Sequence, residues 1–173
     1  MMKRERIRDI TFVALCVAIM AVVSQLAIPF GPVPFTLQAF AVSLIGYFLG
    51  LKRGLAAVAV YIAVGAVGVP VFAGFNGGFG ALISYTGGFI FGYLPFVCLC
   101  ALGKAGWQKI CFGSCGLLLC HLAGVIQYML LSSLSLWVSF FTVSLPFLLK
   151  DIILVIGAYF VSKALNKRLK NTA

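Results

Sequence analysis

The sequence predicts an all-α integral membrane protein: six transmembrane helices in one domain that spans residues 1–173, with an irregular Gly-rich connection between the third and fourth helices. Composition is the first reason, because 63% of the residues are hydrophobic and only 9% are charged, whereas about a quarter of the residues of a soluble domain are charged. The second reason is three charge-free segments, residues 10–51, 54–103 and 110–149. Each is long enough for two spans of about 20 residues and a connection.

The distribution of basic residues is the third reason, and it also predicts orientation. The net charge is +10, and the basic residues gather at the N-terminus, near residues 52–53, near 104–109 and toward the C-terminus. Lys and Arg are enriched in cytoplasmic connections, so both termini are expected in the cytoplasm. The connections near 29–36, 73–87 and 132–144 lack Lys and Arg and are expected outside. This spacing indicates the lipid bilayer of the cytoplasmic membrane as the partner and not nucleic acid.

The six spans are expected at about residues 10–28, 37–51, 54–69, 89–103, 110–131 and 145–165. In the first span, Ala14 and Ala18 are four residues apart, a spacing that allows two helices to approach closely in lipid. These alanines either pack within the bundle or form a docking face for another membrane protein.

The segment IPFGPVPFTLQ at residues 28–38 separates the first two spans. Its three prolines end the first helix and hold the chain extended. Gln38 lies at the external end of the second helix, where its amide either caps the helix or faces a pocket. Lys52 and Arg53 are expected to form a tight cytoplasmic turn before the third helix.

Residues 69–89 carry no charge and include six glycines. Glycine allows unusual backbone angles and close approach of other atoms. Irregular backbone at membrane depth has to line a cavity or be covered by protein. The stretch is therefore predicted to form a lid or a pocket wall; the alternative is an apolar external loop resting on the bundle.

Apart from Lys163 of the C-terminal basic cluster, the Asp, Glu, His, Lys and Arg residues within the expected spans are His121, Lys150 and Asp151. Such residues are costly in lipid and usually functional. Side chains of adjacent helical residues point about 100° apart, so Lys150 and Asp151 are expected to have different partners. Alternatively, Lys150 extends to the outer interface. His121 is interpreted as an internally hydrogen-bonded residue near mid-depth, and Gln127 and Tyr128 lie nearer the external side.

The six cysteines all fall in predicted spans, which is typical of small packing residues. Cys111 and Cys115 share a helix face, but a metal site would need more ligands than the sequence offers. Motifs for nucleotide binding, zinc proteolysis and serine hydrolysis are absent. No catalytic residue, metal or cofactor is therefore expected.

The proline-rich segment, the Gly-rich stretch and the pair Lys150 and Asp151 all fall on the predicted external side. This arrangement favours a protein that captures a small solute from outside in a mostly apolar pocket with a few polar groups. Asn76 offers a donor and an acceptor, Asp151 accepts when ionised, and Lys150 can pair with a carboxylate. The expected ligand is small, partly apolar and acidic.

Four segments, in order and with matching spacing, resemble the signatures of BioY proteins, the biotin-specific substrate-binding (S) components of energy-coupling-factor (ECF) transporters. They are IPFGPVPFTLQ at 28–38, GAVGVPVFAGFNGG at 65–78, YTGGFIFGY at 85–93 and LPFLLKDII at 145–153.

The resemblance implies a six-helix S component that binds biotin near the outer surface. It implies that Asn76 and Asp151 hydrogen-bond the ureido ring and that Tyr85 lines the pocket. It also implies a membrane coupling (T) subunit and two ATPase subunits as partners, with Ala14 and Ala18 matching the docking motif. The commoner family pattern has a lysine three residues after the aspartate, where this chain has Leu154; our hypothesis is that Lys150 supplies the missing ammonium.

Two other classes of function were weighed against this one. A membrane-embedded enzyme is disfavoured because the ionisable groups are too few and because helix direction is expected to separate His121 in depth from Lys150 and Asp151. A stand-alone secondary transporter or channel for a small carboxylated solute would be expected to have inverted repeats and polar midplane residues, which the sequence lacks.

Overall fold

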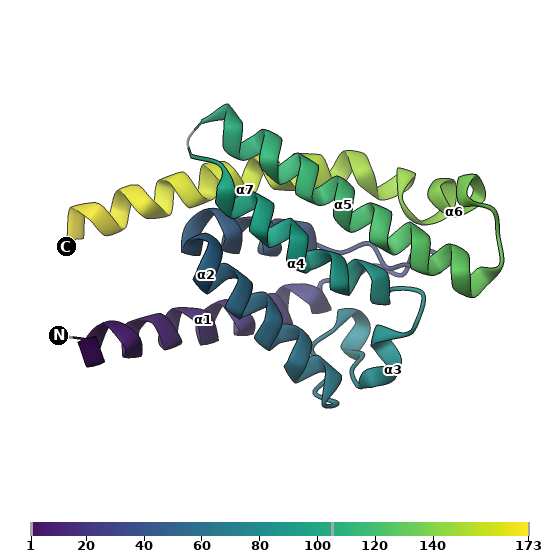
Figure 1. The fold of residues 1–173 in the computed structure, drawn as a ribbon, viewed down its shortest axis with the longest axis horizontal. Helices are drawn as coiled ribbons and strands as arrows, with labels where there is room; N and C mark the ends of the chain where they lie inside the picture. The colour runs from purple at the N-terminus through teal and green to yellow at the C-terminus, as the bar shows by residue number, and fades with distance from the viewer. Residues whose placement is uncertain (1, 105, 173) are drawn as a thin grey trace.

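The protein is described by a computed structural model that covers residues 2–104 and 106–172. Every regular element in these residues is helical: α1 Met2–Gln25, α2 Gln38–Ala66, η1 Ala73–Phe75, α3 Phe79–Leu82, α4 Gly87–Leu102, α5 Trp107–Ser132, α6 Leu136–Val143 and α7 Leu145–Thr172. The long helices form a bundle in which both termini lie at one end, while α3 and α6 lie toward the other (Figure 1). We call the second end the loop end.

Helix α2 is broken at Gly50, whose backbone angles (φ 74°, ψ −174°) are not helical. Its two arms fold back on each other. The hydrogen bond that the Gln38 amide donates to the Tyr61 hydroxyl at 3.0 Å shows this, whereas residues 23 apart in a straight helix would lie about 34 Å apart. Glycine adopts this positive φ without strain. The turn expected at Lys52 and Arg53 therefore lies slightly earlier, and both residues already belong to the second arm.

Small residues let α4 pack closely between α2 and α5. A methyl group at Gly46 would lie 2.5 Å from Cβ of Cys100, and one at Gly88 would lie 2.3 Å from the Ala123 carbonyl oxygen. Real Cβ atoms do not approach so closely, so the three backbones fit only because these positions are glycine. The result is a closely packed centre that holds the loop-end segments in place.

The proline-rich connection at residues 26–37 forms a short hairpin-like turn. Ile28 and Phe35 exchange both backbone hydrogen bonds, at 2.9 and 2.8 Å, and Gly31 provides the positive φ of 63° between them. The extended backbone predicted from the prolines is therefore paired with itself.

The connection at residues 67–86 contains η1 and α3 and is bonded to three helices. The Phe75 backbone N–H donates to the Gln25 side chain of α1 at 2.8 Å. The Gly78 N–H donates to the Gly65 carbonyl of α2 at 2.7 Å, and the Gln127 side chain of α5 donates to the Leu82 carbonyl at 2.9 Å. These bonds satisfy backbone groups that cannot pair within the segment.

Four helices of the described residues are long and apolar enough to cross a membrane: α1 over Glu5–Gln25, α2, α5, and α7 over Leu145–Arg168; α4 is a shorter apolar helix. The observed ends differ from the expected spans mainly where polar residues continue a helix. Helix α1 begins at Met2 and α7 extends to Thr172. The connection expected at 132–144 contains α6, whose start is capped by the Ser135 side chain.

Candidate ligand-binding site

A cavity of about 500 Å³ opens among the two connections and the helices α2, α4, α5 and α7. All five residues predicted to bind a ligand line it: Gln38, Asn76, Tyr85, Lys150 and Asp151. Apolar side chains supply much of the remaining wall, among them Phe72, Phe89, Ile90, Phe96, Leu117 and Phe147. An apolar chamber with a few polar groups is the usual form of a small-molecule site.

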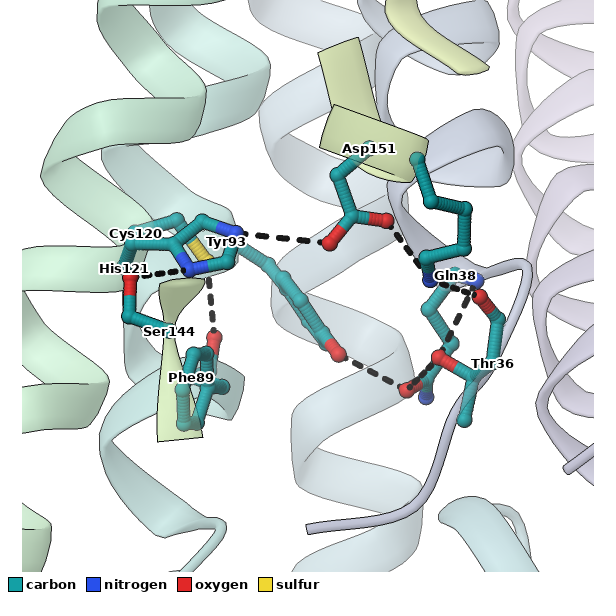
Figure 2. Close-up of polar contacts among 9 residues, drawn as sticks. Thr36, Gln38, Phe89, Tyr93, Cys120, His121, Ser144 and Asp151 are labelled. Carbon is teal, nitrogen blue, oxygen red and sulfur yellow. Dashed lines mark hydrogen bonds and ion pairs between the residues drawn. The ribbon is translucent and has the colours of Figure 1, made fainter. Parts of the chain in front are cut away.

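Asp151 is the most buried charged group of the cavity, with 7% of its surface exposed. Its Oδ1 lies 2.7 Å from the Lys150 ammonium, and its Oδ2 lies 3.3 Å from Nε2 of His121. Figure 2 shows one carboxylate oxygen facing the His121 imidazole and the other oxygen on the opposite side of the carboxylate. The prediction that Lys150 and Asp151 have different partners was wrong in one respect, because the two side chains also pair with each other.

The reason is that the Lys150 ammonium is held by the proline-rich turn at residues 26–37. The ammonium donates to the Thr36 carbonyl at 2.6 Å and lies 4.3 Å from the centre of the Phe35 ring. A cation is attracted to the face of an aromatic ring, so the hairpin-like turn holds the ammonium beside Asp151. Only 18% of the Lys150 side chain is exposed.

The expected separation in depth between His121 and Asp151 was also wrong. At 1.5 Å per residue, His121 lies about 16 Å before the end of α5, and Asp151 lies about 9 Å after the start of α7. Helix α6 makes up the difference by returning the chain into the bundle before α7 begins (Figure 1). His121 is indeed hydrogen-bonded internally, since its Nδ1 lies 2.9 Å from the Ser144 hydroxyl.

The Gln38 amide belongs to a hydrogen-bond chain that crosses the cavity wall. It accepts from the Tyr93 hydroxyl at 2.8 Å and donates to the Tyr61 hydroxyl at 3.0 Å. Tyr61 then donates to the Val71 carbonyl of the Gly-rich connection at 2.9 Å. Gln38 thus faces the cavity and makes no side-chain cap at the start of α2.

Asn76 and Tyr85 lie at the more exposed side of the cavity. The Asn76 side-chain N–H donates to the Ala73 carbonyl at 2.8 Å, a bond that uses the amide nitrogen and not the side-chain oxygen. The Tyr85 ring is 45% exposed and packs against Tyr128, with ring centres 5.3 Å apart. These two residues can contact a ligand without rearrangement of the core.

Ala14 and Ala18 are exposed on α1, so they do not pack within the bundle. Cys111 and Cys115 are also exposed. Within the described residues, no group of three His, Cys, Asp or Glu side chains is placed to hold a metal ion.

Sequence reasoning missed several residues of the site. His121 carried a usable signal, because it is an ionisable residue within a span, but it was interpreted as structural. Phe35, Thr36 and Ser144 carried no signal, since each acts through a contact that only the tertiary fold creates.

Comparison with known proteins gives a consistent result. A sequence profile of the BioY family matches residues 1–171. A probable biotin transporter BioY of Pyrococcus horikoshii is 35% identical over 158 residues, which cover 91% of this chain and 96% of that protein. The biotin transporter BioY of Thermotoga maritima is 52% identical over 77 residues, 44% of this chain and 46% of that protein.

A solved structure is also similar. The crystal structure of the S-component for biotin from an ECF-type ABC transporter superposes with a TM-score of 0.89 at 25% sequence identity, covering 96% of this chain and 95% of that one. The profile match over nearly the whole length, the relatives and the shared architecture agree, and this chain belongs to the BioY family.

Proposed function

We propose that this membrane protein binds biotin and takes it up across the cytoplasmic membrane as the substrate-specific component of an ECF-type transporter. The observation that carries the proposal is the convergence of Gln38, Asn76, Tyr85, Lys150 and Asp151 on one cavity in a chain of the BioY family. The relatives named above are transporters, and biotin itself is the ligand, with no further cofactor.

Within the cavity, Asp151 and Asn76 bind the ureido ring of biotin. The ring offers two N–H donors and one carbonyl acceptor, and an ionised carboxylate is a strong partner for N–H groups. Support comes from Asp151 Oδ1, which is buried and accepts no well-aligned hydrogen bond among the described residues although the Lys150 ammonium is near. Tyr85 covers the bicyclic ring from the exposed side.

Lys150 binds the biotin carboxylate and replaces the lysine that is absent at position 154. Leu154 is partly buried against the apolar core, whereas Lys150 lines the cavity. The flexible stem of lysine allows the ammonium to leave Asp151 and follow the carboxylate.

In the membrane, the chain has six crossing segments: α1, the two arms of α2, α4, α5 and α7. Both termini are cytoplasmic, and the loop end with its cavity faces outward. The basic groups near the termini support this orientation by the positive-inside rule. The Arg53–Asp9 ion pair, 2.8 Å long, joins the second arm of α2 to α1.

The partners are a membrane coupling (T) subunit and a pair of ATPase subunits. Ala14 and Ala18 form the docking face on α1; their exposure supports this, because small residues on a lipid-facing surface allow close approach of a second helix.

The test is equilibrium binding of labelled biotin to the purified chain in detergent, with Lys150→Ala beside the parent. Loss of a charge-assisted contact is expected to weaken binding by about 1.5–3 kcal/mol, or roughly 10- to 150-fold. Lys163→Ala is the matched control, because Lys163 is exposed on the same helix and does not line the cavity. A Lys150→Ala protein that binds as tightly as the parent would refute the assignment of Lys150.

A further inference from the structure

The formal charges of the side chains that line the cavity cancel. Lys150 and Asp151 form an ion pair, and the formal charge count at pH 7 takes His as neutral. The cavity is lined by these titratable side chains: Tyr85 before α4, Tyr93 on α4, Cys120 and His121 on α5, and Lys150 and Asp151 on α7. Helix α6 contributes no titratable group to it, and the junction of α6 and α7 presents only the Ser144 hydroxyl to His121.

Biotin disturbs this balance because it is an anion at neutral pH. Its carboxylate and its uncharged ureido ring lie at opposite ends of the molecule. If the ring bonds Asp151 and the ammonium of Lys150 follows the carboxylate, Asp151 loses its charged partner. One negative charge is then uncompensated inside a largely apolar chamber, a situation that proteins avoid by pairing the charge or by protonating a group.

His121 is placed to supply the missing positive charge. Its Nε2 lies 3.3 Å from Asp151 Oδ2, and its Nδ1 lies 2.9 Å from the Ser144 hydroxyl. The hydroxyl can donate to a neutral Nδ1 and can accept from a protonated one. Protonation at Nδ1 therefore breaks no hydrogen bond, and the contact with Asp151 becomes an ion pair (Figure 2). The Phe89 ring edge completes the packing around the imidazole.

We propose that His121 takes up a proton from solvent when biotin binds, so that its imidazolium replaces Lys150 as the charged partner of Asp151. The proton adds to Nδ1, and no other covalent bond changes. This inference rests on the proposed function and adds to it a residue and a coupled ion: binding of the biotin anion is accompanied by a proton.

The experiment is titration calorimetry of the purified chain with biotin at pH 7.5 in phosphate and in Tris, whose ionisation enthalpies differ. The dependence of the binding enthalpy on buffer gives the number of protons taken up. We expect uptake that approaches one proton per biotin, and affinity that falls by up to tenfold per pH unit as the pH is raised, because binding that consumes protons is opposed at high pH. Biotin methyl ester, which has no charge, is expected to bind without proton uptake.

The variant His121→Gln tests proton uptake by changing the protein, as the methyl ester tests it by changing the ligand. The glutamine amide can donate to Asp151 but cannot accept a proton at these pH values. We expect this variant to bind biotin more weakly and without proton uptake. Tight binding of biotin to the parent with no proton uptake overturns the inference and leaves the proposed function intact, and so does equal uptake for the parent and the variant. Absence of biotin binding by the folded parent overturns both.

Discussion

The Asp151→Asn substitution tests the charged centre of the cavity, because it removes the carboxylate and leaves the Lys150 ammonium behind. Breaking a buried ion pair by removing one partner costs about 3–5 kcal/mol. We expect the lower end, about 3 kcal/mol, because Lys150 keeps its bond to the Thr36 carbonyl and 18% of its side chain is exposed. For a chain of this size, that corresponds to a fall of roughly 6–12 °C in Tm.

The same substitution removes the charged acceptor for the ureido ring. Hydrogen bonds to charged groups contribute about 1.5–3 kcal/mol, so biotin affinity is expected to fall roughly 10- to 150-fold. The double substitution Lys150→Met and Asp151→Asn separates the two effects. The methionine keeps an apolar stem beside the Phe35 and Phe147 rings and leaves no unpaired ammonium, so Tm recovers while binding does not.

Thermal unfolding in detergent and equilibrium binding of labelled biotin, measured on the same preparations, give both quantities. An Asp151→Asn protein with the Tm of the parent would refute the reasoning about the ion pair. A double variant as unstable as the single one would do the same, because the loss of stability would then not come from the unpaired Lys150 ammonium.

Three further outcomes are expected. Gly88→Ala lowers the free energy of unfolding by about 1–3 kcal/mol through overpacking, and so lowers Tm, because the added methyl group meets the Ala123 carbonyl oxygen. Gly157→Ala, with open space around it, leaves Tm unchanged or higher; equal effects of the two substitutions would contradict the packing. Gln38→Leu leaves the buried Tyr93 hydroxyl without its acceptor and costs about 1–3 kcal/mol; a Tm equal to that of the parent would show that the hydrogen-bond chain contributes nothing. Replacing Ala14 and Ala18 by Leu abolishes uptake of labelled biotin into cells that contain the partner subunits but leaves biotin binding by the purified chain unchanged; normal uptake would refute the docking face.

The positions of the apolar helices could be predicted from the sequence because the bilayer imposes a length and a hydropathy on each segment. The fold-back within α2 was also anticipated from the basic pair Lys52 and Arg53. The break itself occurs at Gly50, since backbone conformation and not charge decides where a helix can turn.

The polar contacts at the centre of the site could be predicted only in part from the sequence. Lys150 and Asp151 were predicted to be functional from their cost in lipid. Their mutual contact was not predicted, because the Phe35 ring and the Thr36 carbonyl that hold the Lys150 ammonium belong to a distant turn. The separation in depth between His121 and Asp151 was predicted wrongly because the return of the chain through α6 has no charge or proline signal. Helix geometry alone does not reveal how far one helix is displaced along another.

The central claim is that the loop-end cavity binds biotin, and equilibrium binding of labelled biotin to the purified parent chain in detergent tests it most directly. The account predicts saturable binding of one biotin per chain, and a rise in Tm with biotin concentration because the ligand binds only the folded state. A chain that unfolds cooperatively in detergent, and is therefore folded, but neither binds labelled biotin nor gains stability from it would contradict the account.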